Sequence, residues 1–353
     1  MHRGPALSAA NSAAIDGLRG LAALIVVASH ASGMGLHWVP GLSLAGIGKY
    51  GVFLFFVISA FLLTLQWLQA PPQAGVRGAR LWRYMVRRVL RIYPLYAVVL
   101  LFGWLLPRGL GVPMDGVAVW MHLTLREGRD IYWSVPVEFK YYLAIPFLAW
   151  ALALRLASVW KGLALVALTA LALLVFPPAR SVLNSIALGD YLPIFLCGSA
   201  AAWVLSTGTL PQALQPASAL HLADGVLLLL LAATVPAVLQ WLGADGSLDL
   251  LHREFLGWGG FWALVLLAVV RGWLPGWAAM LRLPMLGACG RWCFGIYLLH
   301  MPALYLAKRL PVPDISRGWV GLAIALVAAA LAHALIERPA MRWAARLTRP
   351  AAG

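Results

Sequence analysis

Long apolar runs separated by short polar segments make up most of this chain of 353 residues. A helix needs about 20 predominantly apolar residues to cross the hydrocarbon core of a bilayer. The pattern therefore predicts about ten membrane-spanning helices, near residues 19–36, 47–69, 91–107, 138–156, 161–177, 190–206, 223–242, 256–272, 285–307 and 318–336. Within 285–307 the segment GACGRWCFG interrupts the apolar run. No internal repeat is evident, which argues against the inverted-repeat plan of many transporters.

The composition supports a membrane protein without a soluble part. Hydrophobic residues make up 62% of the chain and charged residues only 11%, whereas soluble domains average about 25% charged residues. The mean hydropathy is +0.85, and no polar stretch is long enough to build a separate core. We therefore expect an all-α, polytopic helix bundle that forms a single domain over residues 1–353, with no soluble accessory domain.

The positions of the basic residues predict how the bundle sits in the membrane. The net charge of +15 arises from 27 Lys and Arg against 12 Asp and Glu. The arginines lie between apolar runs rather than on one polar face, which argues against nucleic-acid binding and is typical of cytoplasmic loops. With ten spans and a cytoplasmic N-terminus, the basic segments fall on the cytoplasmic side, Lys308, Arg309 and Arg317 excepted. We expect both termini in the cytoplasm.

The cysteines indicate neither a disulfide framework nor a metal site. Cys197, Cys289 and Cys293 lie within or beside apolar runs, which favours buried thiols. Cys289 and Cys293 are one helical turn apart, but no His or carboxylate stands beside them on that turn. We therefore expect no bound metal.

The first apolar run carries an ionisable stripe. Arg19 and His30 are eleven residues apart in DGLRGLAALIVVASHASG, a spacing that places them on one helix face about 16 Å apart. Asp16 lies on nearly the same stripe. Ionisable residues inside a membrane are costly and usually functional. His30 has the chemistry of a general base or an acyl acceptor, and Arg19 that of an anion-binding group. The alternatives are a packed histidine and an Arg19–Asp16 anchor at the interface.

Two further segments place charges at the ends of predicted spans. In RRVLRIYPLY, Arg88 and Arg91 share a helix face and form a candidate phosphate-binding pair. Their alternative role is membrane topology and contact with anionic lipid. In YWSVPVEFKYYLAIP, Glu138 near a span start is a candidate to orient His30 or hold a substrate hydroxyl. Its alternative role is to complement the helix dipole.

Three other segments favour structural roles. Small residues such as Ser59 in GVFLFFVISAFLL allow close helix packing. Arg291 and His300 are nine residues apart, so they face opposite sides of a straight helix, and His300 is more typical of a packed histidine. Glu337 and Arg338 in ALIERPAMRW predict a helix end at the membrane interface.

Taken together, these segments resemble the acyltransferase 3 family of membrane O-acyltransferases over nearly the whole chain. Five motifs of that family occur in the same order. They are the Arg-to-His spacing at Arg19 and His30, FFVxSxF at 55–61, RRxLRIYP at 87–94, WSxxxE at 133–138, and a looser GxxSYxLYLxH at 290–300. The resemblance implies about ten spans and transfer of an acyl group, commonly acetyl, to a carbohydrate hydroxyl.

The resemblance also implies the partners and the site. The donor is cytoplasmic acyl-CoA, and the acceptor is a cell-envelope glycan or a lipid-linked precursor, which places the protein in the bacterial inner membrane. His30 is then the base or acyl relay, Arg19 stabilises negative charge, and Glu138 is a supporting acid. Arg88 and Arg91 serve the donor's phosphates.

The chain departs from the family at two positions. Phe53 stands where relatives often carry an acidic residue, and Ala60 stands where they carry glycine, so no role is transferred to Phe53. Two other functions stay open at this point. One is a transporter or flippase of a lipid-linked glycan, and the other is an acyltransferase that acts on a lipid or a small metabolite.

Overall fold

The computed structural model describes residues 7–69, 78–105, 114–177, 184–211, 217–243 and 255–349. Over these residues the protein is helical and has no strand, apart from an isolated bridge between Val39 and Leu42. The first elements are α1 (Ala9–Gly33), α2 (Gly48–Leu68), α3 (Gly78–Leu105), α4 (Gly116–Leu123), η1 (Asp130–Trp133), α5 (Ser134–Ala153), α6 (Ser158–Val175) and α7 (Leu188–Thr207). The remaining elements are α8 (Ala217–Ala232), α9 (Pro236–Trp241), α11 (Phe255–Arg271), α12 (Pro275–Leu281), α13 (Pro284–Arg291), α14 (Cys293–Arg309), α15 (Asp314–Ala332), η3 (His333–Glu337) and α16 (Arg338–Leu347).

Helices occupy all ten predicted spans, and the all-α prediction is confirmed over the described residues. Within the part of the chain that the structure describes, six helical segments are long and apolar enough to cross a membrane: α1, α2, α3, α6, α7 and the continuous stretch from α15 to α16. The pair α11–α12, bent by 89°, is a seventh candidate. Elsewhere the apolar runs are divided: α8 ends before α9, and α13 ends at Arg291 before α14 begins. α5 is less apolar because it carries Glu138 and Lys140.

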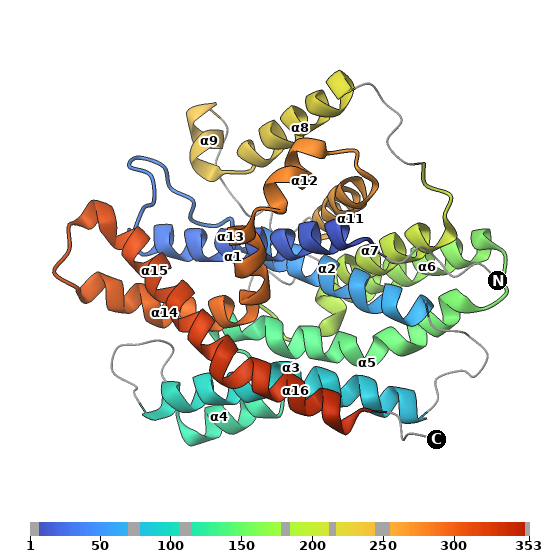
Figure 1. Cartoon of the computed structure of the whole chain (residues 1–353), viewed down its shortest axis with the longest axis horizontal. Helices are drawn as coiled ribbons and strands as arrows, with labels where there is room; N and C mark the ends of the chain where they lie inside the picture. The colour runs from blue at the N-terminus through green and yellow to red at the C-terminus, as the bar shows by residue number, and fades with distance from the viewer. Residues whose placement is uncertain are drawn as a thin grey trace.

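α1 and α2 form the centre of the bundle (Figure 1), with α8 and α9 at one edge and α3, α4 and α16 at the other. The close approach of α1 and α2 requires small residues. A Cβ on Gly51 of α2 would lie 2.5 Å from the Ala22 carbonyl oxygen of α1. Phe53, to which the resemblance transfers no role, is fully buried in the main hydrophobic core, so this span entrance is packed rather than polar.

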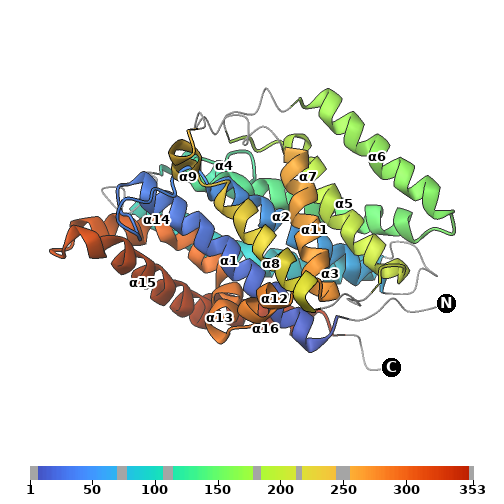
Figure 2. The same ribbon diagram turned by 90° about the horizontal axis from the view of Figure 1, so that it is seen from above.

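The periphery of the bundle is apolar on its outer side. α6 lies at one edge of the bundle (Figure 2), and only Leu165 and Ala172 of its side chains are buried. Leu174 of the same helix is 80% exposed. An apolar surface of this kind suits contact with lipid chains, because lipid offers no hydrogen bonds to polar groups.

The predicted helix end at Glu337 and Arg338 is wrong. A π-helical segment, η3, joins α15 to α16, so the helix continues through Glu337 to Leu347. Pro339 falls in the first turn of α16, where its missing N–H is tolerated. The continuation carries Glu337 into the protein, where only 1% of it is exposed, against α3.

Candidate functional site

The first candidate site is a cavity of about 140 Å³ between α1, α2, α3, α5 and α14. We call it the arginine cavity because Arg19, Arg88 and Arg91 line it from two helices. Glu138 and Cys293 also line it, and aromatic side chains such as Phe55 and Phe56 supply its apolar wall. Four of the five residues predicted to act in the site therefore lie around one cavity, although they are scattered over 120 positions of sequence between Arg19 and Glu138.

Glu138 is held rigidly at this cavity. Its Oε1 accepts hydrogen bonds from the Ser59 hydroxyl at 2.5 Å and from the Tyr142 hydroxyl at 2.6 Å. Ser59 comes from α2, and Tyr142 is one turn along α5 from Glu138 itself. These two hydrogen bonds fix the orientation of the Glu138 carboxyl group. Glu138 contacts these residues and not His30, so the predicted orientation of His30 by Glu138 is absent.

Arg88 and Arg91 have different partners. Arg91 Nη1 lies 2.6 Å from Glu337 Oε2, and the side chain of Glu337 is fully buried. His333 Nδ1 lies 3.4 Å from the same oxygen. By contrast, Arg88 stacks near the rings of Tyr84 and Tyr142 at 5.9 and 5.8 Å. Its Nε is buried and has no hydrogen-bond partner among the described residues. Arg88 is therefore the more available guanidinium for an anion.

Arg19 lies near the start of the stripe on α1. Its Nη1 is 3.7 Å from Asp16 Oδ1, an ion pair one turn apart with both side chains partly exposed. At this distance and exposure the pair is weak. The guanidinium therefore retains hydrogen-bonding capacity toward the arginine cavity, which it lines.

The second candidate site is a larger cavity of about 400 Å³. We call it the histidine cavity, since His30 lines it together with Lys49, Asp130 and Asn184. It shares two wall residues with the arginine cavity, Val52 of α2 and Tyr297 of α14. The Tyr297 hydroxyl donates to the Ile131 carbonyl oxygen and accepts from Ser134 at 2.8 Å. A fixed tyrosine and a valine thus stand between the two cavities.

The hydrogen bonds of His30 define which of its nitrogens is free. Nδ1 lies 2.9 Å from the Val26 carbonyl oxygen and 3.2 Å from Nε2 of His300. His300 Nδ1 in turn lies 2.6 Å from the Tyr297 carbonyl oxygen. Because carbonyl oxygens only accept, both Nδ1 atoms carry hydrogen in the neutral rings. The Nε2 atom of His30 therefore holds the lone pair that a general base needs.

Sequence reasoning missed His300. It interpreted this residue as packed, and His300 is indeed fully buried, but its ring centroid lies 4.9 Å from that of His30. The two residues are 270 positions apart, so no local spacing indicates the contact. The available signals were a histidine in an apolar run and its place at the end of the looser family motif at 290–300. Sequence reasoning also placed Arg19 and His30 on one stripe, whereas they line different cavities.

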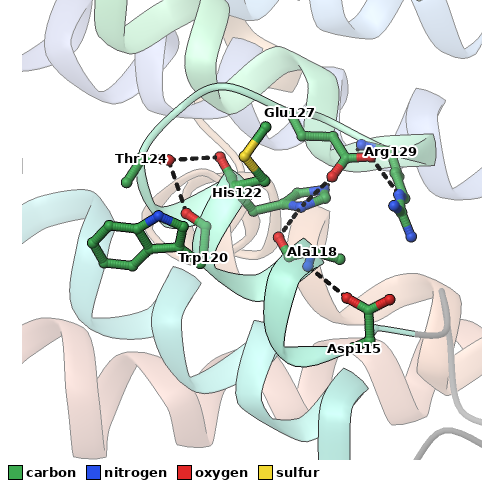
Figure 3. Close-up of polar contacts among 8 residues, drawn as sticks. Asp115, Ala118, Trp120, His122, Thr124, Glu127 and Arg129 are labelled. Carbon is green, nitrogen blue, oxygen red and sulfur yellow. Dashed lines mark hydrogen bonds and ion pairs between the residues drawn. The ribbon is translucent and has the colours of Figure 1, made fainter.

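Figure 3 shows a polar cluster on α4 and in the segment that follows it. The buried His122 donates from Nδ1 to the Ala118 carbonyl oxygen at 2.7 Å and accepts the Arg129 backbone N–H at Nε2, 3.0 Å away. Glu127 and Arg129 form an ion pair at 2.5 Å. Burial lowers the pKa of His122, so the neutral tautomer fits these bonds. The cluster fixes the chain that leads to Asp130.

Residues 12–337 match the family described as an acyltransferase domain, Acyl_transf_3. A curated relative, acyltransferase MdmB of Streptomyces mycarofaciens, is 26% identical over an alignment that covers 96% of this chain and 93% of the relative. No solved structure matches the chain. Over the described residues, no group of three or more His, Cys, Asp or Glu side chains is placed to hold a metal ion.

Proposed function

Because the chain belongs to the acyltransferase 3 family, we propose that it is an O-acyltransferase of the bacterial inner membrane. It moves an acyl group, most simply acetyl, from cytoplasmic acyl-CoA to a hydroxyl of a cell-envelope glycan or lipid-linked sugar. The observation that carries this proposal is the pair of cavities that meet at Val52 and Tyr297. One is lined by guanidinium groups and the other by His30, whose Nδ1 makes the hydrogen bonds and whose Nε2 is left for a proton.

The arginine cavity is the proposed donor site. Acyl-CoA carries several phosphate charges, and guanidinium groups bind phosphate with paired hydrogen bonds. Arg88 is the main phosphate ligand because its Nε lacks a partner among the described residues. Arg91, held by Glu337, adds charge to the same wall. The cavity is small, about 140 Å³, so it holds the arm that runs from the donor's pyrophosphate to its thioester, while the adenosine lies outside, toward the basic loops.

The chemical step takes place where the two cavities meet. His30 Nε2 removes the proton of the acceptor hydroxyl as its oxygen bonds to the thioester carbonyl carbon. Arg19, which lines the donor cavity, stabilises negative charge on the donor. The carbon–sulfur bond then breaks, and the CoA thiolate receives the proton from His30. His300 keeps the Nδ1 hydrogen of His30 in place throughout, and Glu138 helps to position the donor side.

This function is tested by transfer of radiolabel from acetyl-CoA into envelope glycans. Membranes with matched amounts of wild-type, His30→Ala and His221→Ala protein are compared. His221 is the control because its side chain is 67% exposed and lies outside both cavities. We expect wild type and His221→Ala to transfer label and folded His30→Ala protein to transfer none.

The other outcomes separate the alternatives. Label transfer by His30→Ala protein would remove His30 from the mechanism. Absence of transfer by every protein, with movement of a lipid-linked glycan in the absence of donor, would favour a transporter instead. Label retained on wild-type protein without an acceptor, and lost with His30→Ala, would identify His30 as an acyl carrier rather than a base.

A further inference from the structure

Lys49 occupies a position that its own surroundings do not explain. It lies in the first turn of α2, where the helix dipole is positive and a cation is unfavourable. No acidic residue lies in that turn. The Nζ atom is buried and has no hydrogen-bond partner among the described residues. A buried, unpaired ammonium group is costly, so this arrangement calls for a partner other than the described residues.

The partner would enter through the histidine cavity, which Lys49 lines together with His30, Asp130 and Asn184. Asp130 of η1 lines the same cavity, and among the described residues no ion pair joins it to Lys49. Its backbone has φ = 47°, a strained conformation for a residue other than glycine. Strain of this kind often marks a functional position. The cavity thus offers a free cation, a carboxylate and an amide beside the proposed base.

We propose that the histidine cavity binds a hydroxylated acceptor that also carries an anionic group, either a phosphate or a carboxylate. Lys49 binds the anion, Asp130 accepts a hydrogen bond from one hydroxyl, and His30 receives the hydroxyl to be acylated. The volume of about 400 Å³ lies in the range of small-molecule sites and admits a sugar-sized group. This inference rests on the proposed function, because that function assigns the acceptor to the side of His30.

The test is ligand-induced stabilisation of the purified, detergent-solubilised protein, followed by tryptophan fluorescence during heating. Four probes are added without acyl donor: glucose, glucose 1-phosphate, glucuronate and inorganic phosphate. We expect glucose 1-phosphate and glucuronate to raise Tm in a concentration-dependent way, and glucose and phosphate alone to raise it much less. This result would show that both the hydroxyls and the anionic group of the probe contribute to binding.

Three variants locate the anion site. In Lys49→Met, which keeps the length of the side chain, the anionic sugars should bind about 10- to 100-fold more weakly, because a charge-assisted hydrogen bond is lost. Lys49→Arg should retain binding. Arg88→Gln should also retain it, since Arg88 lines the other cavity. Loss of binding in Arg88→Gln but not in Lys49→Met would assign the anions to the arginine cavity and overturn the proposal.

Stability without ligand gives a second measurement. Removal of an unpaired buried ammonium relieves a cost, so ligand-free Lys49→Met should have a Tm equal to or above that of wild type. A clearly lower Tm would show that Lys49 has a partner within the fold. Equal stabilisation by phosphate and glucose 1-phosphate would indicate a simple anion site, and no stabilisation by either anionic sugar would also contradict the proposal.

The anion site and the acyltransferase proposal fail separately. Radiolabel transfer by wild-type protein without stabilisation by any anionic sugar would support the acyltransferase proposal and reject the anion site. Stabilisation that depends on Lys49, with no label transfer, would support the anion site and reject the acyltransferase proposal.

Discussion

Glu337 provides the sharpest prediction about how the site is held together. Its side chain is fully buried and lies 2.6 Å from Arg91 Nη1, while the Arg91 side chain is only 17% exposed. Removing one member of a buried ion pair leaves the other charge without compensation and costs about 3–5 kcal/mol. For a protein of this size, 1 kcal/mol lowers Tm by roughly 2 °C. We therefore expect Glu337→Ala to lower Tm by about 6–10 °C.

The assay is thermal unfolding in one detergent at one pH, with two comparisons. Arg91→Met combined with Glu337→Met removes both charges and should recover at least half of the loss, since a pair of apolar residues can replace a buried ion pair. Asp314→Ala is the matched control. Asp314 and Arg317 are also 2.6 Å apart, but the Asp314 side chain is 88% exposed, so its loss should cost less than about 1 kcal/mol. Equal effects of Glu337→Ala and Asp314→Ala would refute the reasoning from burial.

Three further predictions concern His300, Arg88 and His122. His300→Phe should lower kcat about 10- to 100-fold with little change in KM for acyl-CoA, because a partner that orients the catalytic His30 is lost. Steady-state kinetics measure kcat and KM, and a change confined to KM would contradict this role of His300. Arg88→Gln should raise KM for acyl-CoA about tenfold or more. An unchanged KM would show that the donor's phosphates do not bind at Arg88. For His122, burial lowers the pKa below 6.5, so below about pH 6.5 the unfolded chain binds a proton that the folded protein does not. The Tm of the wild-type protein should fall as pH drops from about 7.5 to about 5, and the Tm of His122→Gln should fall less over the same range. Equal falls in Tm would show that His122 does not contribute to the pH dependence of stability.

Local patterns predicted the helices well, because burial in a membrane imposes a simple rule on composition. Each of the ten apolar runs contains helix. The number of continuous spans was harder to predict, since hydropathy does not register where a helix breaks. Residues 285–307 divide at Trp292 between α13 and α14, and 223–242 divide between α8 and α9. Conversely, η3 carries the last helix past the predicted end at Glu337.

The candidate site followed from sequence only in part. Helical periodicity placed Arg19 and His30 on one stripe of α1, but it gave no information about what packs against the middle of that stripe. Val52 of α2 and Tyr297 of α14 line both cavities, one of which contains Arg19 and the other His30. Contacts such as His30 with His300, or Arg91 with Glu337, join residues 270 and 246 positions apart. Only the packing of the bundle determines them.

The central claim is that donor and acceptor approach from two cavities and react where Val52 and Tyr297 separate them. Cryo-electron microscopy of the protein with a thioether analogue of acetyl-CoA tests this directly. The account predicts density for phosphates beside Arg88, with the acyl end of the analogue at the Val52–Tyr297 wall, directed toward His30 Nε2. An analogue whose phosphates lie in the histidine cavity, or whose acyl end lies away from this wall, would contradict the account.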